Sequence, residues 1–426
     1  MGRGIVQYFE GHRTITFFAI FFLAFAIRFA LLVHYRGDIL AVGEEPRIAE
    51  ALVTKGQFAD PYVIPTGPTA HSTPFFPVLL AGIYKVFGFG FRGQFVRCLL
   101  VIFGYSLLFA LYPTFASAFG FPFAGGLAAG FISALVPVRR SSEVFRGWEE
   151  TWAAMALALL LYLMLKRYRS PQRDAAGAAL LGLCWGAAFY INFSIFSVLV
   201  ALLFVDFVSN RSFRVFRDVC VTFIVALLVI TPWILRDHNA LHGWMLMRDN
   251  LGLELRYGNH DHVHPSAELN GDDPITQQDF QHPGQSVPEA TLIRDMGEVN
   301  YNRQALRLAL TWIRNHPAEF VRLSVERFFF FWLGPLNHRF ETMVISSYTL
   351  LGLAGFTLIR KRVGELQFRL WCTVFVVYPL MYYCVPFAHR YRVPIDWMIW
   401  LSAGLFASVV LERFSVAKAA VPVRVG

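Results

Sequence analysis

The stretch Gly43-Glu44-Glu45-Pro46-Arg47-Ile48-Ala49-Glu50 decides how the chain is interpreted, because it follows directly on the first apolar segment. Two adjacent carboxylates, Glu44 and Glu45, stand where a hydrophobic helix leaves the membrane. Neighbouring acids repel, and burial penalises their charged forms, so such a pair at a membrane boundary indicates chemical use. A plainer explanation stays open: acids followed by a proline also favour the start of a helix.

The composition is that of a polytopic membrane protein. The chain has 426 residues, of which 56% are hydrophobic and 16% charged, and 43 are phenylalanine; the mean hydropathy is +0.48. This is too apolar for a soluble domain. The net charge of +9 is interpreted as a topology signal and not as a nucleic-acid surface. The five cysteines lie in apolar stretches at no metal-ligand spacing, so neither a disulfide framework nor a zinc site is expected.

The first apolar segment, Thr14–Val33, is long enough to span a membrane. Arg3 and Arg13 precede it, which favours a cytosolic N-terminus. No small-residue cleavage site follows, so we interpret it as a retained span and not as a signal peptide. Arg28 lies inside this span, where it either extends toward the surface or meets a phosphate.

The loop after this span contains two short elements that are expected to lie along the outer surface. Arg47–Lys55 has an apolar face at helical spacing, and a Pro/Gly/Thr loop at residues 65–74 follows. Pro74–Phe87 is apolar but shorter than a span. If it does not cross, the basic cluster at residues 166–173 and the basic tail are cytosolic, as the positive-inside bias favours.

We therefore predict an all-α polytopic membrane protein with about ten transmembrane helices and juxtamembrane helices in its outer loops. The chain is treated as one domain, residues 1–426, with outer loops at 34–95, 138–150 and 236–342. Both termini are expected in the cytosol. The expected spans are Thr14–Val33, Val96–Phe115, Phe121–Val138, Thr151–Leu165, Ala175–Ile191, Phe193–Val208, Val219–Leu235, Met343–Ile359, Phe368–Val385 and Ile395–Leu411.

The outer segment from Arg236 to about Arg322 is too long for a structureless loop, so function or a fold of its own is expected. Its first half is polar and rich in turns. The pattern His260-Asp261-His262-Val263-His264 is open to two interpretations, a metal site or a solvated loop, because companion ligands at a recognised spacing are lacking. The second half predicts a helix from Tyr301 and another after Pro317.

Under this topology, acids and arginines from distant loops share the outer face. Moving a sugar from a lipid phosphate needs both kinds: a carboxylate to take a proton from the attacking hydroxyl and cations to stabilise the departing phosphate. Simpler roles stay open, such as lipid headgroup contacts for the arginines, helix initiation for the acids of the second loop and a loop hydrogen bond for the histidine. The outer-face groups are Glu44, Glu45, His71, Arg139, Arg140, Glu143, Glu149, Glu150, Arg236, Arg390 and Arg392.

Four stretches resemble the bacterial membrane glycosyltransferases of the GT-C fold, the group of the protein O-mannosyltransferases and lipid A aminoarabinose transferases. Residues 43–50 resemble the acidic pair that heads a juxtamembrane helix in that group. Residues 74–88 resemble the helix after its first loop. Thr231–Arg236 resembles the end of a later span, and Arg390–Ile395 resembles an element before the last span.

The resemblance implies a polyprenyl-phosphate sugar donor and an inverting transfer on the periplasmic face. The first acidic position of the family, usually Asp, falls on Glu44, which would be the base, and the second falls on Glu45. The acid of the second loop falls on Glu149 or Glu150. At His71, where a Lys-Pro pair is common, the expected lysine is replaced, and a protonated His71 or an arginine would take its place.

The prediction is a glycosyltransferase of the bacterial inner membrane, acting on an acceptor hydroxyl of a lipid, glycan or protein. Arg390 and Arg392, with Arg236, would hold the phosphate of the leaving lipid, and Glu149 or Glu150 would orient a substrate, with a divalent cation as an option. The remaining substrate-binding residues are His71, Arg139 and Arg140. The alternatives are a transporter or flippase of a lipid-linked or anionic substrate, and a structural membrane subunit without activity.

Overall fold

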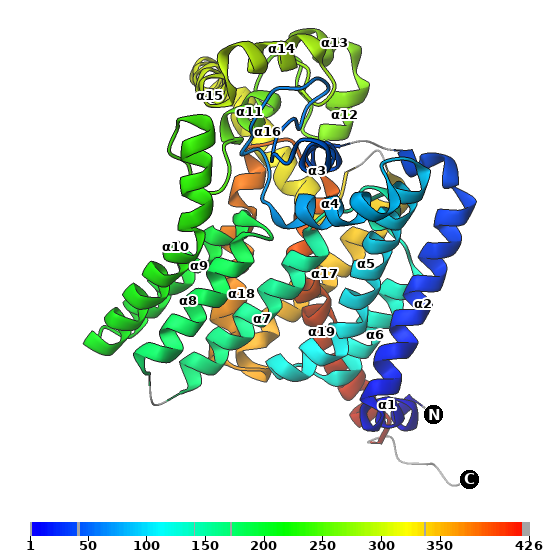
Figure 1. The fold of residues 1–426 in the computed structure, drawn as a ribbon. Helices are drawn as coiled ribbons and strands as arrows, with labels where there is room; N and C mark the ends of the chain where they lie inside the picture. Colours follow the sequence, from blue (N-terminus) through cyan, green and yellow to red (C-terminus); the bar gives the residue numbers. More distant parts are fainter. Residues whose placement is uncertain (1, 41–42, 140, 171–172, 336–337, 420–426) are drawn as a thin grey trace.

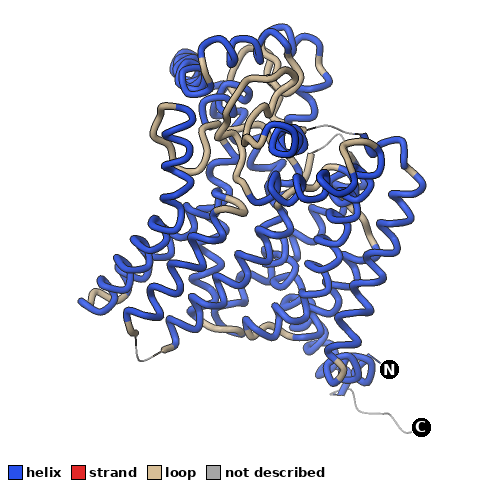
Figure 2. The backbone as a smooth tube through the Cα atoms, in the orientation of Figure 1, coloured by secondary structure: helices blue, strands red, loops and turns tan. Residues whose placement is uncertain are grey.

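The computed structural model describes residues 2–40, 43–139, 141–170, 173–335 and 338–419 (Figures 1 and 2). Within these ranges the chain is helical, with no strand and two isolated β-bridges, Ala59–Pro68 and Ser266–Phe387. A bundle of long helices forms the lower body of the molecule in Figure 1, and a layer of short helices covers its upper end. The fold class predicted from the sequence is confirmed.

Each of the ten expected spans coincides with a helix. Five segments are long and apolar enough to cross a membrane, and shorter apolar helices accompany them, so the chain is a multi-pass membrane protein. The short helix α18 continues into η4 (Tyr378–Tyr383). The ten helices are α2 (Arg13–His34), α5 (Phe91–Phe119), α6 (Phe123–Leu135), α7 (Glu150–Arg169), α8 (Ala175–Phe189), α9 (Phe196–Ser209), α10 (Phe213–Leu241), α17 (Arg339–Arg362), α18 (Glu365–Val377) and α19 (Val393–Ala419).

Small residues let helices of the bundle approach closely, as is typical of membrane interfaces. A Cβ atom added to Gly125 of α6 would lie 2.8 Å from the Cα of Gly404 in α19, and one added to Gly355 of α17 would collide with the Ser402 carbonyl. The backbone of α19 is therefore in contact with both α6 and α17. The segment just before α19 contains Arg390.

Two surface helices follow α2. Helix α3 (Glu44–Lys55) ends at Gly56, whose φ of +67° is a left-handed conformation suited to glycine. Helix α4 (Phe75–Phe87) lies across the upper end of the bundle in Figure 1 and packs on α3. Helix α4 has thirteen residues, about 20 Å, and Figure 1 shows it on the end of the bundle and not within it. Between them, residues 65–74 form the loop that was expected.

The outer segment has a fold of its own. Its turn-rich first half contains four short helices that the sequence pattern did not reveal: α11 (Leu251–Gly258), α12 (Ala267–Asp272), α13 (Pro274–Asp279) and α14 (Val287–Met296). A small apolar core of Leu253, Phe280, Ile293 and Tyr301 joins α11, the end of α13 and α14 to α15 and to the loop of Tyr62. The predicted helices of the second half are confirmed as α15 (Glu298–Asn315) and α16 (Pro317–Leu333).

The remaining short elements lie at the ends of the bundle. Helix α1 (Gly2–Gly11), which the sequence analysis did not foresee, and the end of α19 lie at the lower end in Figure 1. The lower end also receives the basic last turn of α7, Lys166–Arg169, because a helix of 20 residues that starts at the site end reaches about 30 Å away. The others are η1 (Arg36–Leu40), η2 (Ser141–Phe145), η3 (Phe193–Ile195) and η5 (His389–Arg392).

Candidate active site

Trp148 is the residue at which the three outer elements of the site meet. The guanidinium carbon of Arg390 lies 3.7 Å from the centre of the Trp148 ring. A Cβ added to Gly43, just before α3, would lie 2.9 Å from Trp148 Cζ2. Glu149 and Glu150 follow in the chain. Glu44 and Glu45 of α3 therefore lie beside the second-loop acids and Arg390, and we call Glu44, Glu45, Glu149 and Glu150 the four-carboxylate cluster.

Glu44 faces the outer helical layer. Its Oε1 lies 3.6 Å from Nδ1 of His282, and a Cβ at Gly284 would lie 2.7 Å from the same oxygen. Burial alone would raise the pKa of Glu44, but His282, a backbone hydrogen bond and Arg390 more than offset burial, and the pKa is lowered. Glu44 is therefore ionised at neutral pH and able to accept a proton.

Glu45 has the opposite electrostatic character. Only 2% of the residue is exposed. Ser72 donates to its Oε1 at 2.8 Å, and its buried Oε2 has no hydrogen-bond partner among the described residues. Burial, together with the negative charges of Glu149 and Glu44, raises the pKa of Glu45 well above its usual value. The pKa values of the adjacent acids Glu44 and Glu45 are therefore shifted in opposite directions.

Glu149 and Glu150 are the last residue before α7 and its first residue. Asn192 donates to Oε1 of Glu149 at 3.2 Å, and the backbone N–H of Trp148 donates to Oε2 of Glu150 at 2.7 Å. The second oxygen of each carboxylate is buried without a partner among the described residues. Both acids do begin a helix, as the simpler interpretation allowed, but each also keeps a buried oxygen without a partner, and Glu149 lies within electrostatic range of Glu45.

His71 does not act as the cation in place of the family lysine. The residue is 5% exposed, and its Nδ1 lies 3.2 Å from the Tyr62 hydroxyl. Burial lowers the pKa of His71 to about 3 despite the opposing effect of Glu44, so the ring is neutral. Arg248 donates from Nε to the His71 carbonyl at 2.9 Å, and its Nη nitrogens have no partner among the described residues. Arg248 is thus a cation beside His71 that the sequence analysis missed.

Two of the expected substrate-binding arginines, Arg392 and Arg236, do not lie in the four-carboxylate cluster. Arg392 is 1% exposed and donates to Asp396, Thr349 and two backbone carbonyls, so it has a structural role just before the last span. Arg236 donates to the carbonyls of Phe58 and Thr69 and so braces the loop that carries His71. Arg140 lies outside the described residues.

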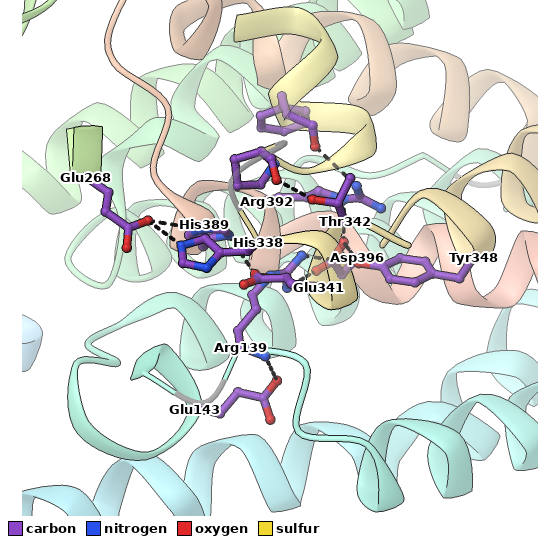
Figure 3. Close-up of polar contacts among 12 residues, drawn as sticks. Arg139, Glu143, Glu268, His338, Glu341, Thr342, Tyr348, His389, Arg392 and Asp396 are labelled. Atoms are coloured by element: carbon purple, nitrogen blue, oxygen red, sulfur yellow. Dashed lines mark hydrogen bonds and ion pairs between the residues drawn. The ribbon is translucent and has the colours of Figure 1, made fainter. Parts of the chain in front are cut away.

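Arg139 belongs to a second polar network, drawn in Figure 3. It donates to Asp396 at 2.5 Å and to the Tyr348 hydroxyl at 3.2 Å, and Glu341 lies 4.0 Å away. Arg139 also lines a cleft between α5, α6, α17 and α19. The walls of that cleft are mainly apolar and aromatic and include Tyr105, Leu108, Phe109, Tyr112, Val344 and Trp400.

Arg28, whose role the sequence left open, is fully buried and bonded. Its Nε donates to Glu143 Oε2 at 2.8 Å, and its other nitrogens donate to the carbonyls of Ser133 and Ala134. The second oxygen of Glu143 accepts from the Arg139 backbone N–H at 3.1 Å. Neither a phosphate nor the surface is needed to satisfy Arg28, and Glu143 is not free for substrate.

The histidine-rich pattern does not converge on one point. His262 pairs with Asp279 at 2.7 Å and His264 with Asp273 at 2.8 Å, while His260 is buried with its Nδ1 2.8 Å from the Asp261 carbonyl. The three rings thus have separate partners. Of the two interpretations, the structure favours ordinary loop pairing and gives no common metal site to this pattern.

No protein-family model matches the chain, and no curated protein matches it. Among solved structures, the chain is similar to the archaeal oligosaccharyltransferase AglB from Archaeoglobus fulgidus in complex with an inhibitory peptide and a dolichol-phosphate. That match has a TM-score of 0.52 at 14% identity and covers 98% of this chain and 53% of AglB. A match to ArnT from Cupriavidus metallidurans bound to undecaprenyl phosphate has a TM-score of 0.34 at 12% identity. It covers 98% of this chain and 80% of ArnT.

The match to AglB shows the fold. This chain has the GT-C fold that its motifs led us to expect, and it spans about half the length of AglB. The activity, donor and acceptor do not follow from a similarity at this identity.

Proposed function

We propose that the chain is a glycosyltransferase that moves a sugar from a polyprenyl-phosphate donor to an acceptor hydroxyl, with inversion at the anomeric carbon. The observation that carries the proposal is the meeting of Glu44, Arg390 and three further carboxylates at one end of a GT-C bundle, beside an apolar cleft. In another fold, such a group of residues would suit several reactions. In this fold, sugar transfer from a lipid phosphate gives a role to the acids, to the arginine and to the apolar cleft.

Glu44 is the proposed general base. In the reaction, the acceptor oxygen forms a bond to the anomeric carbon while the bond from that carbon to the phosphate oxygen breaks. The hydroxyl proton passes to Glu44, and the lipid phosphate leaves with the electron pair. A carboxylate that is ionised at neutral pH and only partly exposed, 16% for its side chain, suits this role.

Arg390 and Arg248 are the proposed phosphate-binding cations. Arg390 is held over the Trp148 ring, which restricts the positions of its donors, and planar guanidinium groups match phosphate oxygens. Arg248 is held at one end by the His71 carbonyl, so its remaining donors are available. Together they would stabilise the charge that develops on the departing phosphate. Arg392, which the sequence analysis included, is replaced in this role by Arg248.

The apolar cleft is the proposed site of the polyprenyl chain. It lies between α5, α6, α17 and α19, and its lining residue Tyr105 is within electrostatic range of both Glu150 and Arg139. A lipid tail in the cleft would therefore place its head group near the four-carboxylate cluster. Aromatic walls suit an unsaturated hydrocarbon chain because they offer large apolar contact areas.

The four-carboxylate cluster also fits a divalent cation in its chemistry. Glu45, Glu149 and Glu150 each have a buried oxygen without a partner among the described residues, and oxygen ligands of this kind suit Mg²⁺ or Mn²⁺. Their oxygens are not gathered within 4.8 Å of one another, so side-chain rotation would accompany binding. When bound, such an ion would polarise the phosphate of the donor. Glu149 and Glu150 would orient the substrate in either case.

The test is sugar transfer by the purified protein and its Glu44→Gln variant, with a radiolabelled polyprenyl-phosphate sugar as donor. Mass spectrometry of lipids and glycans from cells with and without the gene would first identify the sugar and acceptor. We expect the Gln variant to fold and to lose transfer, while Glu50→Gln, an exposed change on the same helix, leaves it intact. Unchanged transfer by folded Glu44→Gln protein would remove Glu44 from the mechanism.

A transporter or flippase is the alternative, and the distribution of charge speaks against it. In the described part of the ten bundle helices, every Asp, Glu, Lys and Arg lies within about two turns of a helix end. A pathway for a charged substrate would need polar groups near the middle of the membrane. A structural subunit without activity is excluded by any turnover of the lipid donor.

A further inference from the structure

We propose that Glu268, His338 and His389 bind one divalent transition-metal ion, at a site separate from the four-carboxylate cluster. Within the part of the chain that the structure describes, these side chains form the one group of three potential ligands whose donor atoms all lie within 4.8 Å of one another. They come from three distant places: α12, the start of α17 and η5 (Figure 3).

The two imidazoles are directed at one carboxylate oxygen. Nε2 of His338 lies 2.9 Å from Glu268 Oε2, and Nε2 of His389 lies 4.0 Å from the same atom. A Zn²⁺ ion binds nitrogen and oxygen at about 2.0–2.2 Å, which separates the ligand atoms by roughly 3.3 Å in a tetrahedron. The existing separations bracket that value, so small side-chain rotations would admit the ion.

A carboxylate lies behind His389. Nδ1 of His389 lies 2.7 Å from Glu341 Oε1, in an ion-pair contact that is not aligned as a hydrogen bond, and Nε2 faces Glu268. A small rotation of Glu341 would complete the hydrogen bond. A histidine ligand whose other nitrogen meets a carboxylate is the usual arrangement around zinc. Glu341 is also 4.0 Å from Arg139, so the proposed site is connected to the network of Arg139 and Asp396 in Figure 3.

The backbone around the ligands is already fixed. Residue 267 donates its N–H to the Phe387 carbonyl at 2.9 Å, and Phe387 donates to the Pro265 carbonyl at 2.7 Å. This bridge holds the start of α12 beside η5, so Glu268 and His389 are neighbours before any ion binds. Ligands on a preformed backbone bind metal without a large ordering cost.

The identity of the donor atoms selects the class of metal. Two imidazole nitrogens and one carboxylate suit Zn²⁺ and other first-row divalent ions better than Mg²⁺ or Ca²⁺, which prefer oxygen. Glu268 and His338 keep 44% and 42% of their side chains exposed, so a fourth position is open to water. Because His389 directly precedes Arg390, an ion here would fasten the outer helical layer to the loop that carries the proposed phosphate-binding arginine.

The test is Zn²⁺ binding by the purified full chain, freed of any polyhistidine tag and stripped of metal by a chelator. We expect one Zn²⁺ per chain by calorimetry, and a Co²⁺ derivative with the visible absorption of four-coordinate cobalt. His338→Ala and Glu268→Gln should abolish both signals, and Glu341→Gln should weaken binding by about 10- to 100-fold. His262→Ala is the matched control, since His262 pairs with an aspartate in the same outer layer.

Melting curves of the metal-free variants check that each one folds. Wild-type protein that binds no more Zn²⁺ than His338→Ala, or equal loss in the His262→Ala control, would overturn the proposal and leave an ordinary histidine–carboxylate ion pair. The readout is metal binding and not sugar transfer, so failure here leaves the proposed function standing, and failure of Glu44 as base leaves this site standing.

Discussion

The guanidinium of Arg390 lies over the indole of Trp148, with its carbon 3.7 Å from the ring centre. Trp148 directly precedes Glu149 and Glu150, and Gly43 lies at the Cζ2 edge of the Trp148 ring. One aromatic ring therefore fixes the position of a cation relative to two acids that follow it and two that lie at the start of α3. This contact is the centre of the proposed active site.

Replacing Arg390 by lysine keeps the positive charge but removes the planar group that stacks on Trp148. Because a cation–π contact contributes about 0.5–2 kcal/mol, we expect the KM for the lipid donor to rise by roughly 2- to 30-fold, and Arg390→Ala to lose more. Initial rates against donor concentration measure this. Arg256→Lys is the control, since Arg256 lies over Phe280 in the outer layer; an equal effect there would contradict a special role for Arg390.

Gly284 is the position where the outer layer touches the proposed base. An alanine Cβ would lie 2.7 Å from Glu44 Oε1 and 3.0 Å from His282 Nδ1, so Gly284→Ala must displace Glu44. Small displacements of a reacting group cost up to about 100-fold in rate, and we expect kcat to fall toward that value with little change in melting temperature. Gly271→Ala, where no atom lies within 4 Å, should leave kcat unchanged. Normal turnover by Gly284→Ala would place the reaction elsewhere.

Glu298 makes stability depend on pH. It is 4% exposed and accepts from the Thr69 hydroxyl and the Ala70 N–H. Burial raises the pKa of Glu298 to about 8 from an ordinary value of 4.5. The folded state then keeps a proton that the unfolded state releases, so this contribution to stability is complete below about pH 4.5 and is lost as the pH rises to about 8.

Melting temperatures between pH 5 and pH 8.5 test this dependence. Glu298→Gln cannot ionise, so its curve should decline less over this range than that of the wild type. Asp295→Asn, an exposed change in the preceding helix, should follow the wild-type curve. Parallel curves for wild type and Glu298→Gln would show that another group controls the dependence.

The convergence of Glu44 and Glu45 with Glu149 and Glu150 was predictable because membrane-length apolar segments leave few topologies. Once Pro74–Phe87 is assigned to the surface, the parity of the spans places both loops at one end. The helix boundaries followed for the same reason: apolar runs of this length must satisfy their backbone internally. Sequence reasoning was therefore strong wherever the bilayer itself imposes the constraint.

The bilayer does not constrain the outer helical layer in this way, so the sequence said less about which residues of that layer lie close together. His282 and Arg248 lie in a segment whose position depends on tertiary contacts, so no periodicity indicated that they face Glu44 and His71. Arg392 was grouped with Arg390 because the two are close in sequence, yet residues two apart on a helical turn face different directions. The three residues of the proposed metal site are separated by 50 or more positions, beyond the reach of any spacing rule.

The buried pair of Arg28 and Glu143 provides the last prediction, on stability. Arg28 is 0% exposed and Glu143 is 4% exposed, and the pair links α2 to the turn that carries Arg139. Removing one partner leaves a buried charge without compensation, which costs about 3–5 kcal/mol. We expect Arg28→Met and Glu143→Leu each to lower the melting temperature of the detergent-solubilised protein strongly. The double variant should be more stable than either single variant, because no uncompensated charge remains; additive losses would contradict this pairing.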